Sequence, residues 1–289
     1  MTEEIKRLRR VCFTGHRPEK LNRSEKSVLD GLETAIRQAI VDGSNVFISG
    51  MARGVDIWAA EIVLQIRSEG EDIKLICASP YRGFEKNWSI DWQRRYNNLV
   101  WEKVCAEVMD NQLQKPIGGL RLPMPLAEQY RDMRHKKLID LIDKPQWSGT
   151  APNSELFVKQ AEDTLIPDLI SIVNVDGNYQ FIIFDAKYYN IQLEHNKKLR
   201  GQPGIESITK QYLYQLAYQP FVEAHQIGTV RNCFLMPTSS AEIVEKGTAS
   251  LSMLSELGLQ DIQVRLLPAE MMYRHYIDNT KLDLQLLNL

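Results

Sequence analysis

The feature that most constrains this chain is a short hairpin pattern that sets two aspartates opposite each other. The dipeptide Asp176-Gly177 separates the apolar runs 169–175 and 179–184, and such a dipeptide predicts a two-residue β-turn. In the register that this turn sets, Asp168 lies directly opposite Asp185. Directly opposed side chains point to the same face, with Cβ atoms about 5 Å apart. Like charges in such a pair are destabilising unless a cation neutralises them. The sequence therefore predicts a hairpin with a cation-binding end.

A lysine belongs to the same predicted patch. Lys187 lies two positions beyond Asp185, so strand alternation returns its side chain to the same face, about 7 Å along the strand. Two alternatives stay open. The charges can be edge charges of a solvated sheet face, or a three-residue turn can shift the register and oppose Asp168 to Ala186. The apolar run 181–184 is typical of a strand buried on both faces, which favours a site at the end of a core strand.

These residues resemble a known fold. The pair Pro167-Asp168, the run Asp185-Ala186-Lys187 and the helical pattern 210–218 resemble the PD-(D/E)xK nuclease fold. More narrowly, they are similar to the McrC and LlaJI type of restriction endonuclease subunit. The resemblance runs from Leu99 to the end of the chain. It implies an α/β restriction-endonuclease-like core and a metal-dependent DNA endonuclease of a restriction or anti-phage defence system.

The chemistry of phosphodiester cleavage fits this constellation. The reaction needs an activated water and stabilisation of the charge on the phosphate, and Mg²⁺ or Mn²⁺ ions can supply both. Hard cations prefer oxygen ligands. The resemblance therefore implies Asp168, Asp185 and the carbonyl of Ala186 as metal ligands. Lys187 would position the water or stabilise the charge on the phosphate.

Two helical patterns supply further candidates. Helical spacing places Gln211, Tyr214 and Gln215 on one face, and in the resemblance a glutamine of this helix supports the site. Gln211 and Gln215 are therefore candidate catalytic residues. Glu102 borders the apolar stripe of a helix predicted over 100–109, and the resemblance makes it a candidate catalytic residue and metal ligand. The alternatives are an amphipathic helix that covers the sheet and, for Glu102, a surface charge.

The first hundred residues have a different organisation. Apolar runs of strand length occur at 11–14, 46–49 and 73–77. Amphipathic helical patterns at 26–41 and 55–67 separate them. A strand-helix-strand-helix-strand order predicts a parallel sheet with right-handed crossovers. We expect a partial Rossmann-like domain.

Two loops of this domain are candidate ligand sites. The loops 14–20 and 49–56 follow strands, and open α/β sheets bind ligands at the carboxyl ends of their strands. Both resemble the SLOG domains of the DprA/LOG superfamily, and the first narrows the resemblance to the YpsA-like branch. The alternatives are a helix N-cap for Asp56 and a solvated turn for Arg53. The resemblance implies a nucleotide-derived ligand or nucleic acid, contacted by Gly15, Arg17, Gly50, Arg53, Gly54 and Asp56.

The boundary between the two domains has to be placed by resemblance. SLOG domains normally continue with further strands, whereas here the predicted sheet is truncated at three strands and leads directly into the nuclease-like segment. We therefore expect a SLOG-like domain over 1–97 and a nuclease domain over 98–289. The Pro- and Gly-rich stretches 115–125 and 144–152 are expected to be loops of the second domain.

Composition limits the class of protein. A formal net charge of −2 at pH 7 is not that of an avid general DNA binder. The basic cluster 197–200 is the best candidate for contacting a DNA backbone. The four cysteines have no paired spacing, so neither zinc nor a disulfide framework is indicated, and a reducing cytoplasm is the expected location. No apolar run reaches membrane-spanning length.

Partners and other function classes follow from the resemblance. It implies DNA as the substrate and an AAA+ GTPase or ATPase motor subunit, McrB-like, as a partner. The sequence leaves the oligomeric state open. A non-enzymatic nucleotide- or nucleic-acid-binding sensor with an inert nuclease-like scaffold is the main alternative, and a small-molecule enzyme such as a phosphoribohydrolase is another. The intact Asp-Asp-Lys set is evidence against an inert scaffold. The shortened sheet is evidence against a small-molecule enzyme.

Overall fold

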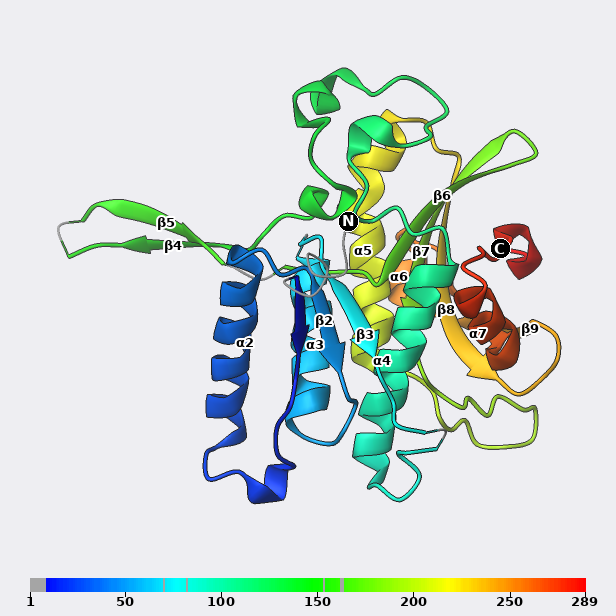
Figure 1. The fold of residues 1–289 in the computed structure, drawn as a ribbon. Coiled ribbons are helices and arrows are strands. Elements are labelled where there is room, and N and C mark those ends of the chain that lie inside the picture. Colours follow the sequence, from blue (N-terminus) through cyan, green and yellow to red (C-terminus); the bar gives the residue numbers. More distant parts are fainter. Residues whose placement is uncertain (1–8, 70, 82, 153, 162–163) are drawn as a thin grey trace. The chain divides into compact units, whose positions relative to one another are not determined.

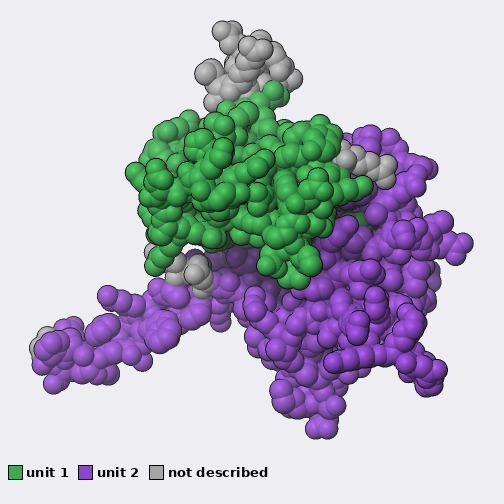
Figure 2. Space-filling model, turned by 90° about the horizontal axis from the view of Figure 1, so that it is seen from below, with its two compact units in different colours: residues 1–101 green, residues 102–289 purple. Residues whose placement is uncertain are grey.

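The chain is an α/β protein whose residues cluster into two compact units. The computed structural model describes residues 9–69, 71–81, 83–152, 154–161 and 164–289. The units are Met1–Trp101 and Glu102–Leu289 (Figure 2). Each unit has its own sheet.

A three-stranded parallel sheet forms the centre of the N-terminal unit, with strand order β1-β2-β3. The strands are Arg10–Cys12, Val46–Ser49 and Lys74–Cys77, and the helices α2 (Glu25–Val41) and α3 (Val55–Ser68) connect them (Figure 1). This order confirms the predicted partial Rossmann-like sheet.

The core of this unit forms around α3. Ile57, Ala60 and Val63 recur at three-residue spacing and are fully buried, together with Phe47 and Leu75 of the sheet. Residues with this spacing lie on one face of a helix. Packing of that face fixes the start of α3 and therefore the loop that precedes it.

The helix α4 differs from its prediction. It runs without interruption over Ile90–Val108, whereas the helix predicted from the sequence covered only 100–109. No proline or glycine interrupts this segment, so one helix is favoured. The junction predicted between residues 97 and 98 falls within α4, as does the change from one compact unit to the other. The predicted domain limits stay predictions.

The C-terminal unit is built on a five-stranded mixed sheet with strand order β6-β7-β8-β10-β9. β7, β8 and β10 are mutually parallel, and the outer strands β6 and β9 are antiparallel to their neighbours. The strands are β6 Leu169–Val175, β7 Asn178–Ala186, β8 Thr229–Thr238, β9 Val244–Ala249 and β10 Ile262–Pro268.

Helix α5 lies along one face of this sheet. It spans Ile205–Ala224 and confirms the helix predicted around 210–218 (Figure 1). Its residues Tyr214, Tyr218 and Phe221 are buried in the main core of the unit with side chains of β6 and β7. The other helices of the described chain are α6 Ser252–Ser255, α7 Ala269–Ile277 and the short 3₁₀ segments Pro18–Lys20, Ile117–Gly119, Glu128–Met133, Leu138–Leu141 and Leu284–Leu287.

The β6–β7 hairpin has the predicted register. Val175 pairs with Asn178, and the ladder continues to the pair Leu169 and Phe184. Asp176 and Gly177 have φ angles of 51° and 86°, as a two-residue turn of the I′ type requires. The alternative three-residue turn is therefore wrong.

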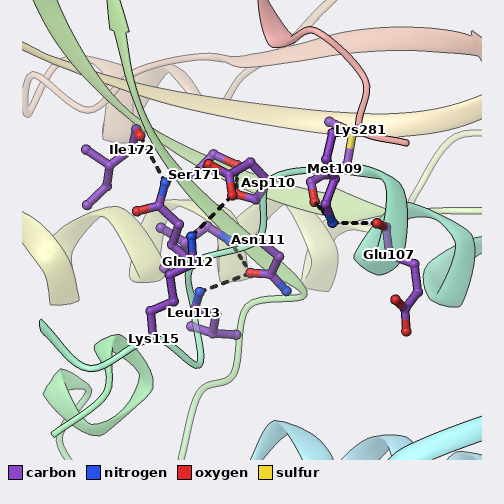
Figure 3. Close-up of polar contacts among 11 residues, drawn as sticks. Glu107, Met109, Asp110, Asn111, Gln112, Leu113, Lys115, Ser171, Ile172 and Lys281 are labelled. Carbon is purple, nitrogen blue, oxygen red and sulfur yellow. Dashed lines mark hydrogen bonds and ion pairs between the residues drawn. The ribbon is translucent and has the colours of Figure 1, made fainter. Parts of the chain in front are cut away.

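A loop covers part of the free edge of β6. Asn111 Oδ1 accepts a hydrogen bond from Ile170 N at 3.3 Å, and Gln112 N donates to Ile170 O at 2.7 Å. The side chain of Gln112 continues along the edge, because its Nε2 donates to Ile172 O at 3.0 Å (Figure 3). An uncovered edge strand exposes unpaired main-chain groups. These contacts fix β6 and the aspartate that precedes it.

A second hairpin was not predicted. The stretch 144–152, expected to be a loop, contains β4 (Gln146–Thr150), which pairs with β5 (Leu156–Gln160) in a separate antiparallel ladder. Figure 2 shows this hairpin as an arm that extends from the rest of the C-terminal unit. The proline and glycine residues of this stretch suggested a loop. However, Pro145 precedes β4 and does not interrupt it. Gly149 lies beneath the ring of Phe157, and a Cβ at this position would come within 2.7 Å of that ring.

None of Cys12, Cys77, Cys105 and Cys233 forms a disulfide. None of the helices in the described part of the chain combines the length and apolar character needed to span a membrane.

Replacing Gln112 by alanine tests how much the edge loop contributes to stability. Gln112 is 3% exposed, and its loss leaves the Ile172 carbonyl without that donor. We expect the free energy of unfolding, measured by urea denaturation, to fall by about 1–3 kcal/mol. The control is Gln202→Ala, an exposed position in the same unit. An equal effect in the two variants would contradict this role.

Candidate active site

The candidate site lies at the open end of the β6–β7 hairpin. Asp168 directly precedes β6, Asp185 is the second-last residue of β7, and Lys187 directly follows β7. Pairing of Leu169 with Phe184 sets the register beside them. The turn chemistry at the far end of the hairpin therefore determines which residues meet here.

Short polar contacts join these residues. Asp168 Oδ2 accepts a hydrogen bond from Ala186 N at 2.8 Å. Lys187 Nζ lies 2.6 Å from Asp185 Oδ1. The main chain of Lys187 is held as well, because its N donates to Leu235 O at 2.9 Å, beyond the last residue pair of β7 and β8. The structure thus brings together Asp168, Asp185, Ala186 and Lys187.

The charges of this cluster do not balance. The side chains of Asp185 and Lys187 are 7% and 26% exposed. Burial, and then the charge of Asp168, raises the pKa of Asp185 well above its usual range. Burial acts to lower the pKa of Lys187, but the Asp168 and Asp185 carboxylates outweigh it and raise that pKa. One ammonium faces two carboxylates, so a proton or a metal cation is needed to neutralise the remaining negative charge.

Glu102 acts electrostatically on this cluster. Its charge contributes to the raised pKa of Lys187, after the larger effects of burial and the two aspartates. The described residues contain no group of three or more His, Cys, Asp or Glu side chains arranged to hold a metal ion. Glu102 therefore does not form a three-carboxylate cluster with Asp168 and Asp185 in this structure. Its catalytic and metal-binding roles stay predictions.

The two glutamines of α5 differ in their surroundings. Gln215 Oε1 accepts hydrogen bonds from Asn232 Nδ2 at 2.9 Å and from Gln260 N at 3.0 Å. These contacts hold α5 to β8 and to the segment before β10. Gln211 is fully buried, and neither its Oε1 nor its Nε2 has a hydrogen-bond partner among the described residues. A buried amide without partners is costly, so Gln211 is the better candidate for contacting a ligand.

Tyr214 supports the site in a way that the sequence did not reveal. Its Oη donates to Ile166 O at 2.7 Å, two residues before Asp168. Burial, followed by the charges of Asp168 and Asp185, raises the pKa of Tyr214. Helical spacing placed Tyr214 on the face of Gln211, but no local pattern indicates a bond to a residue so distant in the chain.

A groove of about 530 Å³ begins directly after Lys187. The segment 188–191 forms one wall, the segment 237–239 at the end of β8 forms another, and Leu266 and Ala269 complete the lining. Tyr188 and Tyr189 supply aromatic rings, which suit stacking on nucleic-acid bases. Asn190, Thr238 and Ser239 of the same segments supply hydrogen-bonding groups.

In the N-terminal unit the two predicted ligand loops pack against each other. A Cβ on Gly15 would come within 2.5 Å of the side chain of Val55. Gly54 has a φ of 93°, and a Cβ there would come within 2.6 Å of the main-chain oxygen of His16. These two glycines are therefore required by backbone conformation and close packing, whether or not a ligand binds.

Asp56 closes the second loop. Its Oδ2 accepts a hydrogen bond from Ala52 N at 3.4 Å, and a Cβ on Gly50 would lie 2.8 Å from the same oxygen. Burial raises the pKa of Asp56. The N-cap of α3 is Gly54, so the alternative of Asp56 as the N-cap is wrong.

The two predicted arginines have different surroundings. Arg53 Nη2 lies 2.7 Å from Glu19 Oε1, which links the second loop to the first. Arg53 Nε is buried without a hydrogen-bond partner among the described residues. Arg17 is exposed and directly precedes the 3₁₀ segment Pro18–Lys20. A phosphate at these loops would compete with Glu19 for Arg53, and the ligand contacts of both arginines stay predictions.

Two regions of the chain match known protein families. Residues 128–268 match the LlaJI restriction endonuclease family, and residues 11–117 match the YspA SLOG family. The chain carries a LlaJI restriction endonuclease domain and a YspA SLOG domain. The LlaJI region contains Asp168, Asp185 and Lys187, whereas Glu102 lies in the region that matches the SLOG family. The SLOG match extends beyond residue 97.

Curated relatives reflect the same two parts. The chain is 29% identical over 185 residues to the type II restriction enzyme BsuMI component YdjA of Bacillus subtilis, covering 64% of this chain and 33% of the relative. It is 35% identical over 74 residues to a UPF0398 protein of Brevibacillus brevis, covering 26% and 37%. It is 26% identical over 139 residues to a UPF0398 protein of Shouchella clausii, covering 46% and 74%.

The extent of these matches is limited. The chain spans about a third of the length of the BsuMI component and of the Brevibacillus protein. No solved structure matches the chain significantly. The relatives therefore support the two domain assignments.

The raised pKa of Asp185 predicts a pH dependence of stability. The folded protein holds this proton more tightly than the unfolded chain, so the stability that the proton contributes is lost as pH rises through and above the usual carboxyl range. We expect Asp185→Asn to gain stability relative to the wild type as pH increases from about 4 to about 8. The measurement is the free energy of unfolding by denaturant in a metal chelator. The same trend in the exposed variant Asp132→Asn would contradict the assignment.

Proposed function

We propose that this protein is a Mg²⁺-dependent DNA endonuclease of a restriction or anti-phage defence system. The observation that carries the proposal is the contact between Asp168, Asp185 and Lys187 at the end of β7, inside the region that matches the LlaJI family. Two carboxylates facing one ammonium leave a negative charge in a largely buried place. Such a cluster suits a divalent cation and a phosphate group.

The residues present fit a hard divalent ion. Asp168, Asp185 and the carbonyl of Ala186 supply oxygen donors, which Mg²⁺ and Mn²⁺ prefer. The raised pKa of Asp185 supports this fit, because an ion bound there would replace the proton as the neutralising charge. A bound Mg²⁺ supplies Lewis-acid stabilisation of the phosphate and activation of water. Glu102 would approach this site as a further carboxylate.

Lys187 and the α5 side chains have separate roles in this proposal. Lys187 keeps its proton at neutral pH because the carboxylates raise its pKa, so its ammonium donates hydrogen bonds to a phosphate oxygen rather than accepting a proton. Gln211, whose amide atoms lack partners in the described structure, orients the attacking water or a phosphate oxygen. Gln215 and Tyr214 hold α5 in place through Asn232 and Ile166.

DNA is the proposed substrate. The groove that begins at residue 188 would receive the strand adjacent to the scissile phosphate. The following loop is closed by main-chain pairing of Gln192 with Arg200. It carries the basic cluster 197–200, of which Lys197 also pairs with Glu194 at 2.7 Å. We propose that this loop contacts the DNA backbone, and phosphate contacts of this kind depend strongly on salt.

The wider assembly follows from the relatives. The BsuMI relative is described as a component of a restriction enzyme, and we propose that this chain likewise acts with other subunits. An AAA+ GTPase or ATPase motor, McrB-like, is the proposed partner, in the cytoplasm. The proposed division of labour is a regulatory domain over 1–97 and a nuclease domain over 98–289.

Regulation by a nucleotide-derived ligand is the proposed role of the SLOG domain. The two loops meet at Arg53 and Glu19, and the buried Nε of Arg53 has no partner in the described structure. No side chain caps the N-terminus of α3. Val55 N and Ile57 N donate to His16 O and Ala52 O, so the helix dipole rather than a row of free amides would favour an anion there. Gly15, Arg17, Gly50, Gly54 and Asp56 would form the rest of this site.

Cleavage of plasmid DNA tests the nuclease. We expect Asp185→Asn and Lys187→Met each to lower the rate of cleavage in Mg²⁺ or Mn²⁺ at least 100-fold, because each loses a group that stabilises the transition state. Lys115→Met, at an exposed lysine of the same unit, should cleave at the wild-type rate. Wild-type activity in either site variant would place the reaction elsewhere. Wild-type protein that neither cuts nor is stabilised by Mg²⁺ would favour the inert-scaffold alternative.

Thermal-shift titration tests the regulatory domain. A ligand that binds the folded protein raises Tm, and we expect a panel of nucleotides to contain one that does so in the wild type. Arg53→Ala should lose at least half of that shift and keep the shift caused by Mg²⁺. Arg37→Ala removes an arginine that is also ion-paired in the same unit and should keep both shifts. Equal nucleotide shifts in the two variants would remove Arg53 from the site.

A further inference from the structure

The β4–β5 arm is too small and too apolar to be explained as a free surface feature. Each strand has five residues, and every side chain of β5 is exposed. Trp147, Leu156, Phe157 and Val158 are 71%, 78%, 43% and 64% exposed. An isolated two-stranded hairpin is only marginally stable in water, and a cluster of exposed apolar side chains indicates an interaction surface.

Both faces of the arm carry apolar side chains. Paired residues point to the same face, and successive residues of a strand alternate between faces. Because Gly149 pairs with Phe157, Trp147 and Phe157 lie on one face. Leu156 and Val158 lie on the other face. Lys159 is the one charged residue in the two strand sequences. A surface that binds the DNA backbone needs several positive charges. The composition of the arm therefore favours a protein partner.

The hydrogen bonds within the arm show which main-chain groups are left for that partner. Ala151 N donates to Glu155 O, and Ala161 N donates to Pro145 O, each at 2.8 Å. Bonded and non-bonded pairs alternate along an antiparallel ladder. Leu156, Val158 and Gln160 are therefore in non-bonded pairs, and their N–H and C=O groups point away from β4.

The outer edge of β5 is better suited to pairing than that of β4. The sequence Leu156-Phe157-Val158-Lys159-Gln160 contains no proline or glycine, and its aromatic and branched residues favour strands. β4 contains Gly149, which weakens a strand. An exposed apolar edge of this kind is a template for another strand.

We infer that β5 pairs antiparallel with β5 of a second copy of this chain, across a twofold axis at Val158. In this register Leu156 faces Gln160 of the second copy, Phe157 faces Lys159 of the second copy, and the two Val158 residues face each other. The N–H and C=O groups of Leu156, Val158 and Gln160 point away from β4. The pair of Leu156 with Gln160 and the pair of the two Val158 residues would therefore exchange hydrogen bonds between the copies.

The neighbouring twofold registers are less favourable. A shift toward the C-terminus opposes Lys159 to its own copy, and directly opposed like charges are destabilising. A shift toward the N-terminus brings Ser154 into the ladder, where a φ of 66° is incompatible with a strand. The chosen register also sets each Lys159 beside a phenylalanine, an arrangement that already exists within one arm, where Lys159 Nζ lies 6.0 Å from the centre of the Phe157 ring.

The resulting assembly is a four-stranded sheet with strand order β4-β5-β5-β4. The same patch serves both copies, as a twofold interface requires. Four strands exceed the number needed for independent stability of a sheet. The inference does not depend on the proposed nuclease activity. If that activity holds, the dimer brings two candidate sites to one DNA molecule.

Sedimentation velocity of the full chain tests the dimer. We expect the wild type to form a dimer that strengthens with concentration, and Val158→Lys to be monomeric, because two ammonium groups would meet at the axis. Ser148→Lys is the matched control. It adds the same charge to the same face, on the residue paired with Val158, but one strand farther from the axis. A monomeric wild type, a dimeric Val158→Lys variant or a monomeric Ser148→Lys variant would each overturn the inference.

Cross-linking tests the register. Opposed residues in a hydrogen-bonded pair have Cα atoms about 5.5 Å apart, a distance that a disulfide spans. In a Cys12→Ser background, which removes the exposed native cysteine, Val158→Cys should form a covalent dimer on oxidation. Ser148→Cys should not, because its copies would lie about 14 Å apart, three strand spacings. No cross-link at 158, or equal cross-linking at both positions, would exclude this axis.

Discussion

The register of the β6–β7 hairpin is the constraint on which the candidate site depends. A turn of Asp176 and Gly177, both with positive φ, fixes the pairing from Val175 to Leu169. That pairing brings Asp168 to the end of β7, where it accepts a hydrogen bond from Ala186 N. A slip of the β6–β7 pairing by one residue would place Asp168 and Asp185 on opposite faces of the sheet. The chemistry at one end of the hairpin is thus determined by backbone conformation at the other end.

The cost of this arrangement is electrostatic. Asp168 and Asp185 share one ammonium, and burial deprives Asp185 of water, so its pKa rises. Structural ion pairs normally balance their charges when they are buried. An unbalanced cluster at the end of core strands is typical of functional sites rather than of stabilising ones. The edge loop with Gln112 and the bond from Tyr214 to Ile166 hold β6 and the chain before it in place.

The N-terminal SLOG domain shows how packing and ligand binding can share one pattern. Gly15 and Gly54 match the expected ligand loops, yet their lack of a side chain is already required by contacts with Val55 and His16. Glycine patterns alone therefore cannot separate a binding loop from a closely packed one. Arg53, held by Glu19 but with a buried Nε lacking a partner in the described structure, distinguishes the two cases better.

Local features follow from the sequence alone: the hairpin register, the parallel N-terminal sheet and the helix that carries Gln211. Each is explained by turn chemistry or by the period of apolar residues. Other features depend on the folded chain. In the folded chain Gln215 accepts a hydrogen bond from Asn232, whereas the side chain of Gln211 has no hydrogen-bond partner among the described residues. A proline- and glycine-containing stretch also forms a strand there. These outcomes depend on contacts between residues far apart in the chain, and a one-dimensional pattern carries no information about which distant groups will meet.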